Sequence, residues 1–174
     1  MESPRKKVIA TVSGPFAPPT VSSATSQTAT QFSANWTNEG YTYRVDVSTN
    51  PAMTNIVYND LAASASPFVV SGLTPGQNYY YRVQAVKVTS ITCISGESSV
   101  IGTITVPSPP TNFSTTIKSS SIVASWSPVM GASSYTIDVS SSSDFSPGPE
   151  GYYITSSTNT TSVEVSGIKP TTSY

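Results

Sequence analysis

The feature that most constrains the fold of this chain is an internal repeat of about 90 residues. Four segments recur in the same order, at offsets between 90 and 95 residues. They are Pro18-Pro-Thr20 with Pro109-Pro-Thr111, Phe32-x-Ala-x-Trp36 with Ile122-x-Ala-x-Trp126, Tyr43-x-x-Asp-Val-Ser48 with Tyr135-x-x-Asp-Val-Ser140, and Ser71-Gly-x-x-Pro75 with Ser166-Gly-x-x-Pro170. A repeated unit of this length has the size of a small sandwich domain.

Within each repeat, apolar and polar residues alternate with a period of two. Phe32, Ala34 and Trp36 alternate with polar residues, and the segments that begin at Tyr43 and Tyr79 follow the same rule. This pattern indicates half-buried β-strands with one face on a core and one face in water. Gly, Pro and Asn residues separate these segments, and no stretch shows a sustained helical period. Short strands between such turns predict an all-β fold of antiparallel sandwiches.

The charge composition argues against several classes of partner. Charged residues make up 10% of the chain, and its formal net charge is -1. Three of the eight Lys and Arg residues lie together at Arg5, Lys6 and Lys7, and this run is too short for a nucleic-acid patch. No apolar run approaches the roughly 18 residues that span a bilayer. We therefore expect neither nucleic-acid binding nor membrane insertion.

The residue types needed for common active sites are scarce. The chain has no His and one cysteine, Cys93, so it lacks a Ser-His-Asp triad, a His-ligated zinc site and an intramolecular disulfide. We expect Cys93 to be a buried or half-buried apolar residue. The nine carboxylates are scattered, and Asp46 and Asp138 occupy equivalent outward strand positions. This equivalence favours a role as ladder partner, for Arg44 or Arg82, over catalysis. The sequence predicts no enzyme activity, no cofactor and no metal site.

Several motifs together resemble the fibronectin type III domain. They are a Pro-Pro pair at the entry, a Trp that ends the second strand, and Tyr-x-Val-x-Val on the third strand. The most specific motif is Leu73-x-Pro75-Gly-x-x-Tyr79, followed by Tyr81-x-Val83-x-Ala85. The resemblance implies immunoglobulin-like antiparallel β-sandwiches in tandem, with Tyr79 forming a tyrosine corner at the turn between strands E and F. The repeats are similar to those of bacterial secreted or cell-surface modular proteins.

The inward positions of this pattern predict a structural core. We expect Trp36 and Trp126 to lie between two sheets rather than to act as sugar platforms, because each shares the strand phase of the apolar residues before it. The predicted core residues are Phe32, Trp36, Tyr43, Val45, Leu73, Pro75, Tyr79, Val83, Trp126, Tyr135 and Ile168. Outward positions predict an exposed aromatic and basic interaction patch, made of Arg44, Tyr58, Tyr80 and Arg82.

The alignment of the two repeats predicts the domain boundaries. Residues 17–107 are expected to form a complete domain and residues 108–174 an incomplete one. Tyr174 aligns with Tyr79, so strands F and G of the second domain would follow the end of this sequence. Such a remainder is expected to be unstable as a separate monomer.

Residues 1–16 are expected to be a G-strand-like remnant of a preceding repeat or an N-terminal leader. The segment Val8-Ile-Ala-Thr-Val12 is similar to Val100-Ile-Gly-Thr-Ile104, which precedes the second repeat. Three explanations remain open at this point. The chain is a fragment of a longer array, or strands exchange between chains, or a natural N-terminus mimics a G strand.

The repeat and the missing chemistry predict a non-catalytic structural or interaction module. Such a module would be a spacer or an adhesive segment of an extracellular multi-repeat protein, and its partner would be a protein, a polysaccharide or the neighbouring repeats. The alternative is an accessory fibronectin type III module of a secreted carbohydrate-active enzyme. Both imply an extracellular or cell-surface location, although no apolar signal segment follows the basic residues near Met1.

Overall fold

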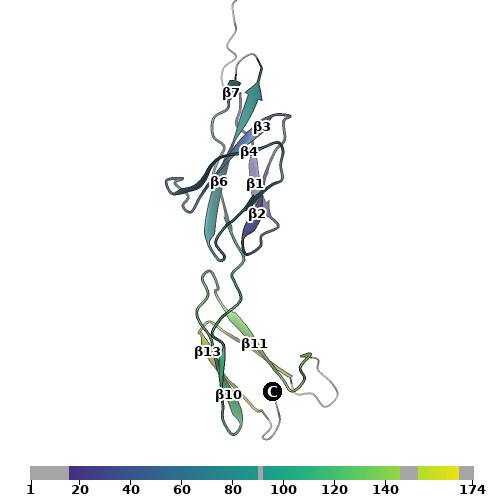
Figure 1. Cartoon of the computed structure of the whole chain (residues 1–174), viewed down its shortest axis with the longest axis vertical. Helices are drawn as coiled ribbons and strands as arrows, with labels where there is room; N and C mark the ends of the chain where they lie inside the picture. Colours follow the sequence, from purple (N-terminus) through teal and green to yellow (C-terminus); the bar gives the residue numbers. More distant parts are fainter. Residues whose placement is uncertain (1–15, 90–91, 146–152, 169–174) are drawn as a thin grey trace, which may run out of the picture. The chain divides into compact units, whose positions relative to one another are not determined.

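A computed structural model of the chain describes residues 16–89, 92–145 and 153–168. These residues form strands, turns and loops, with no helix among them, which confirms the predicted all-β class (Figure 1). They fall into two compact units. The first unit holds strands β1 to β8 and the second holds β9 to β13. We describe each unit by itself.

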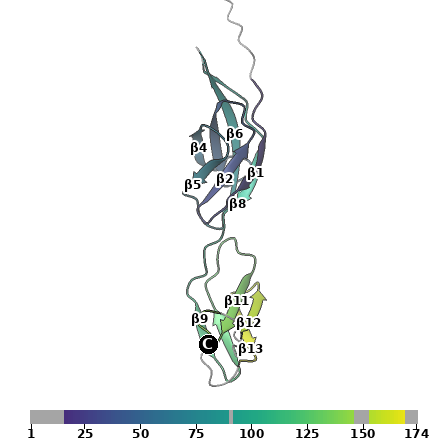
Figure 2. The same ribbon diagram turned by 90° about the vertical axis from the view of Figure 1, so that its right-hand side faces the viewer.

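The first unit has a three-stranded antiparallel sheet on one side. Its strands are β1 (Val21–Thr25), β2 (Gln31–Trp36) and β5 (Phe68–Ser71), in the order β1-β2-β5 (Figure 2). The side chains of Phe32, Ala34 and Trp36 on β2 are buried because they alternate toward the second sheet.

The opposite sheet of the first unit is built around β3 and β6. It contains β3 (Thr42–Ser48), β4 (Ile56–Ala63), β6 (Asn78–Val88), β7 (Thr92–Ile94) and β8 (Ile101–Ile104). The order is β4-β3-β6, and both β7 and β8 pair with β6. Between these two short strands, the hydroxyls of Ser95 and Ser98 accept the backbone N–H groups of Ala85 and Val83, each at 2.9 Å. Between β7 and β8, serine hydroxyls therefore accept the backbone N–H groups of β6 that no strand pairs with there.

The two sheets enclose one aromatic core. On β6, Tyr79, Tyr81, Val83 and Ala85 are at most 3% exposed, as the period of two requires. The rings of Phe32 and Tyr81 lie 5.6 Å apart across the sandwich. Of the predicted core residues between Phe32 and Val83, all are buried except Pro75, which is half-buried.

The hydroxyl of Tyr81 ties the two sheets together. It donates to the backbone oxygen of Ser22 on β1 and accepts the backbone N–H of Asn35 on β2 at 3.2 Å. Burial raises the pKa of this hydroxyl above its usual range, and the hydrogen bond from Asn35 offsets part of the rise. Tyr79 is also buried, and its assignment as a tyrosine corner stays a prediction.

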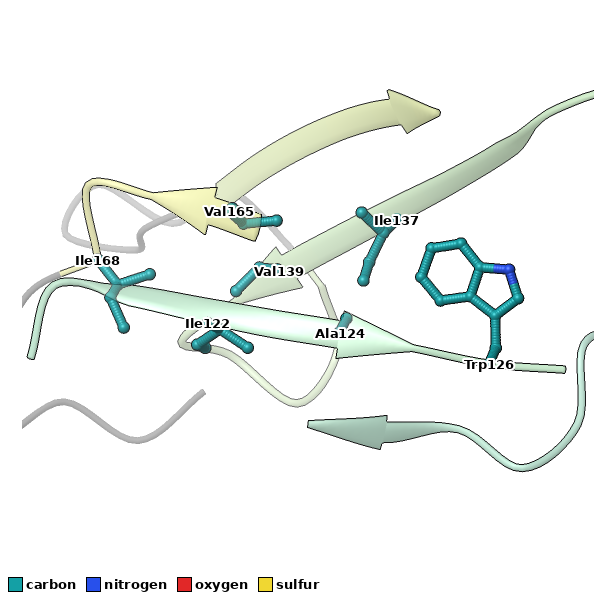
Figure 3. Close-up of a cluster of buried hydrophobic side chains, with 7 residues drawn as sticks. All are labelled: Ile122, Ala124, Trp126, Ile137, Val139, Val165 and Ile168. Carbon is teal, nitrogen blue, oxygen red and sulfur yellow. The ribbon is translucent and has the colours of Figure 1, made fainter. Parts of the chain in front are cut away.

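The second unit repeats part of this plan. Its first sheet has the order β13-β10-β9, formed by β9 (Ser114–Ile117), β10 (Ser121–Ser125) and β13 (Ser162–Ser166). The second sheet is the antiparallel pair of β11 (Tyr135–Ser140) and β12 (Tyr153–Thr158). Figure 3 shows side chains of β10, β11 and β13 pointing toward one another between these sheets. The buried cluster is Ile122, Ala124, Trp126, Ile137, Val139, Val165 and Ile168, and the predicted core residue Tyr135 is partly buried against it.

Candidate interaction surface

The outer face of β3 and β6 carries the polar side chains that alternate with the core residues. Asp46 on β3 lies directly opposite Arg82 on β6, and Ser48 lies opposite Tyr80. The inward neighbours Val45 and Val83 fix this arrangement, because adjacent residues of a strand point to opposite faces. The sequence prediction that Asp46 faces away from the core is therefore consistent with the register.

The polar groups on this face are bound to one another. The Asp46 carboxylate accepts the Nε–H of Arg82 at 3.0 Å, and the other end of the guanidinium lies 2.6 Å from a Glu97 carboxylate oxygen. Asp46 is 6% exposed, so it is a buried acid rather than the solvated ladder residue that was expected. Of the two predicted partners, Arg82 forms the pair with Asp46.

A β-bulge explains why Asp46 is covered. The register between β3 and β4 shifts between Val45 and Val47, and Asp60 on β4 has a φ of 57°. The backbone N–H of Asp60 donates to Asp46 at 2.8 Å. The Asp46 carboxylate therefore accepts the backbone N–H of Asp60 at the bulge, where the strand ladder is irregular. The bulged segment of β4 covers this carboxylate.

The four residues of the predicted patch separate in the structure. The hydroxyl of Tyr58 donates to the backbone oxygen of Ser71 on β5, at 2.9 Å. Tyr58 is paired with the buried Val47 because of the register shift, so its side chain reaches the other sheet and not the face of Arg82. The Tyr58 hydroxyl is thus engaged with β5, and an interaction patch of Arg44, Tyr58, Tyr80 and Arg82 stays a prediction.

The remaining members of the patch are also engaged. A guanidinium nitrogen of Arg44 lies 3.5 Å from a carboxylate oxygen of Asp60, and both side chains are exposed. The ring of Tyr80 is half-buried against β8, where a Cβ on Gly102 would lie 3.1 Å from the Cε1 atom of the ring. Because Gly102 has no side chain, the Tyr80 ring can pack against the backbone of β8.

The matching position in the second unit is far more open. Asp138 on β11 lies opposite Thr155 on β12, whose hydroxyl donates to the carboxylate at 2.8 Å. Asp138 is exposed, and it forms no ion pair with a residue of the described ranges. In that part of the chain β11 pairs with β12 alone, whereas β3 pairs with both β4 and β6.

An apolar groove lies in the second unit beside the ring of Trp126. It has a volume of about 720 Å³, and its lining includes Phe113, Trp126, Tyr135 and Ile137. The rings of Trp126 and Tyr135 lie 5.3 Å apart, and the Tyr135 hydroxyl accepts the backbone N–H of Val129 at 2.9 Å. The sequence marked Trp126 and Tyr135 as core, but an open groove beside them was not predicted.

One further ion pair lies on the other sheet of the second unit. The Lys118 ammonium is 3.0 Å from the carboxylate of Glu164, which also accepts the Ser121 hydroxyl at 2.6 Å. The hydrogen bond from Ser121 and the neighbouring Lys118 hold the pKa of the Glu164 carboxyl below its usual range. This cluster joins β10 to β13 and leaves no free carboxylate oxygen for a ligand.

The structure offers no assembled metal or membrane site in its described residues. Nowhere in the described ranges do three or more His, Cys, Asp or Glu residues come together as potential metal ligands. Those ranges also contain no helix that is long and apolar enough to cross a membrane. The thiol of Cys93 is free and half-buried.

The comparisons with known proteins give structural neighbours only. No protein-family model matches the sequence, and no curated protein sequence matches it. Solved structures that resemble the chain include fibronectin type III domains. The sixth such domain of human fibronectin type III domain containing protein 3 is 25% identical, with a TM-score of 0.43, and the match covers 56% of this chain and 91% of that domain.

Two other solved structures illustrate the range of proteins that resemble this chain. A two-domain fibronectin type III segment of chicken tenascin is 20% identical over 89% of this chain and 86% of its own length, with a TM-score of 0.46. A β-1,2-glucanase from Parabacteroides distasonis is 17% identical over 53% of this chain, with a TM-score of 0.41, and the match covers 13% of the glucanase.

Proposed function

We propose that this chain is a non-catalytic structural and interaction module, a spacer or adhesive segment of an extracellular protein built from several repeats. The observation that carries the proposal is the internal repetition. Both units place a Trp and a Tyr ring about 5 Å apart at matching positions, Trp36 with Tyr43 and Trp126 with Tyr135. A chain that repeats the same sandwich supplies length and surface, not a unique reactive centre.

The polar clusters support a structural role. Asp46, Arg82 and Glu97 satisfy one another, and they hold the bulge of β4 to the centre of the sheet. The Lys118 and Glu164 pair likewise joins neighbouring strands. Charged groups that are already paired in this way serve the fold rather than proton transfer.

We rank a protein partner ahead of a polysaccharide. Binding a sugar on an aromatic platform needs an exposed ring, whereas Trp36 and Trp126 are 5% and 8% exposed. These two rings therefore do not support the alternative function, an accessory sugar-binding module of a secreted carbohydrate-active enzyme. We also propose the boundaries stated above, with residues 17–107 as one domain and 108–174 as the beginning of the next.

Two experiments test the proposed function. Antibodies raised against residues 17–107 should label intact cells of the source organism, with no increase after permeabilisation. Labelling that requires permeabilisation would exclude an extracellular location. In a second experiment, the purified chain is applied to immobilised extracellular proteins and to insoluble polysaccharides, and retention on polysaccharide alone would favour the accessory-module alternative.

A further inference from the structure

Three Asn-x-Ser/Thr sequons occur in the chain, and they begin at Asn35, Asn112 and Asn159. The sequon is the acceptor signal for an N-linked glycan. The pattern alone does not distinguish the three, because a chain so rich in Ser and Thr contains such matches by chance. A glycan is bulky and has to lie on the surface, so the structure can select among them.

The sequon at Asn35 is held inside a sheet. Asn35 lies on β2, which pairs with β1 on one side and with β5 on the other. Its side-chain nitrogen donates to the backbone oxygen of Ser23 at 2.8 Å and to the hydroxyl of Thr25 at 3.2 Å. A glycan on this nitrogen would replace both bonds to β1 with a bulky group, which excludes Asn35 in the folded unit.

Both polar groups of the sequon at Asn112 are also engaged. The side-chain nitrogen of Asn112 donates to the hydroxyl of Ser127 at 2.9 Å. The hydroxyl of Ser114, the third residue of the sequon, lies 2.8 Å from the hydroxyl of Ser125 on β10. Transfer to Asn112 would therefore first have to break a hydrogen bond of its side chain.

The sequon at Asn159 is open. Asn159 is exposed and lies in the turn between β12 and β13. The hydroxyl of Thr158 accepts the backbone N–H of Thr160 at 3.1 Å, and a bond of this kind fixes a turn with Asn159 at its centre. Among the described residues, neither the Asn159 amide nor the Thr161 hydroxyl has a hydrogen-bond partner. Both side-chain groups of this sequon are thus available.

The matching turn of the first unit is exposed as well. Trp126 donates its backbone N–H to the backbone oxygen of Thr161 at 3.0 Å, as Trp36 donates to the hydroxyl oxygen of Ser66 at 2.9 Å. The two turns therefore lie in the same place, beside the strand that carries the Trp. Residues 64–65 of the first turn are exposed although β3 is paired on both sides. Exposure of this turn is thus a property of the repeat and does not arise from the pairing of β11.

We propose that Asn159 is an N-glycosylation site, at which the folded chain receives an oligosaccharide from a lipid-diphosphate donor. The Asn159 Nδ2 atom forms a bond to the anomeric carbon of the sugar. The bond from that carbon to the diphosphate oxygen breaks, and the lipid diphosphate leaves with the electron pair. A base of the transferase takes the proton that the amide nitrogen loses.

This site rests on the extracellular location proposed above, because the sequon acts as an acceptor in secreted proteins. It also adds to the proposed function. A glycan on Asn159 would shield the turn between β12 and β13, so a protein partner would contact another surface of the second unit.

The first test compares the three sequons in the purified, folded 174-residue chain. The probe is a lipid-diphosphate-linked oligosaccharide with a transferase that modifies short peptides of all three sequons at similar rates. Peptide mass spectrometry gives the initial rate at each site. Transfer at Asn112 should be about threefold to tenfold slower than at Asn159, the factor of one net hydrogen bond. Asn35 should be slowest, because it lies within a paired strand.

The second test uses variants of the sequon in cells that secrete the full chain and attach N-linked glycans. Asn159→Gln and Thr161→Val should both lose the mass of the glycan. Thr161→Val keeps the side-chain shape and the backbone oxygen that binds Trp126, so it removes only the hydroxyl. Thr161→Ser is the matched control, and it should keep the glycan because it preserves the sequon.

Three results would overturn the proposal. One is a folded chain in which Asn112 or Asn35 is modified as fast as Asn159. Another is a secreted chain whose glycan survives both Asn159→Gln and Thr161→Val. The third is parent protein from the surface of source cells that carries no glycan at Asn159. This last result would leave the extracellular location intact, whereas antibody labelling that requires permeabilisation would contradict the location itself.

Discussion

The two units differ most in how their third strands are sheltered. β3 lies between β4 and β6, and its inward side chains Tyr43, Val45 and Val47 are at most 2% exposed. β11 has the same Tyr-x-x-Asp-Val-Ser sequence but pairs with β12 alone in the described residues, and its inward Ile137 and Val139 are 8% exposed. The same strand sequence thus gives two levels of burial, because the neighbouring strands and not the strand itself complete the cover.

The acids on the two strands show the same difference. Asp46 is held by Arg82 on one side and by the backbone of Asp60 on the other. Asp138 has the hydroxyl of Thr155 on one side, and no strand of the described ranges pairs with β11 on the other. An identical residue at the same strand position is a buried structural acid in one unit and an exposed group in the other.

The largest expected difference is in backbone protection. In dilute, monomeric 174-residue chain, amides after Pro109 should exchange with solvent quickly and those of the first unit slowly. Each apolar side chain contributes about 1.5–3 kcal/mol when fully covered, and several in the second unit border the open groove. Hydrogen exchange with mass spectrometry measures this, and equal protection in both units would contradict the prediction.

Replacing each Trp by Ala should lower the unfolding free energy of the two units by different amounts. Trp36→Ala should cost the first unit about 3–5 kcal/mol of unfolding free energy, because the ring fills a closed core. Trp126→Ala should cost the second unit less, since that ring already borders the groove. Urea unfolding followed by hydrogen exchange of each unit gives both values. Trp→Phe at each position is the conservative control, and equal losses for the two Ala variants would show that the groove does not matter.

Replacing the two acids should also have unequal effects. Asp46→Asn should destabilise the first unit by about 1–3 kcal/mol, because the buried Arg82 contact loses its charge and the Asp60 N–H loses a strong acceptor. Asp138→Asn should change the second unit by less than about 0.5 kcal/mol, as expected for an exposed side chain. Thermal unfolding of the two variants beside the parent chain tests this, and a larger effect at Asp138 would reverse the comparison.

The hydroxyl that joins the sheets of the first unit should contribute a smaller amount. Tyr81→Phe should cost about 1–2 kcal/mol, because the Asn35 N–H loses its buried partner. Tyr80→Phe, on the same strand and half-buried against β8, is the matched control and should be nearly neutral. Chemical denaturation measures both variants, and equal effects would show that the bond between the sheets is not stabilising.

The smallest expected effect is a pH dependence of the second unit. Because the folded pKa of Glu164 lies below the value of an unfolded chain, its stabilisation is present above that unfolded pKa, near 4.5. It should be lost as the pH falls through the folded pKa. Glu164→Gln should flatten this acid limb of the stability curve in the second unit and leave the first unit unchanged. An acid limb of the same slope in the variant would assign the effect to other carboxylates.

The strands and their inward faces could be predicted from the sequence. Phe32, Ala34 and Trp36 alternate with polar residues, and the structure buries all three. The repeat marked a Trp and a Tyr of each unit as core, and the structure places the two rings of each pair 5.2 and 5.3 Å apart. These features follow from a local period of two and from the sizes of the side chains, so the sequence alone is enough to predict them.

The tertiary structure alone decided the features that depend on pairing between distant strands. The bulge at Asp60 turned Tyr58 away from the predicted patch and covered Asp46, although nothing in the local pattern marks a shift of register there. Ser95 and Ser98 continue the ladder of β6 where the last strand breaks, and their sequence resembles a loop. The physical reason is that a register is set by the fit of whole strands, and one extra residue in a strand changes the face on which the following side chains lie.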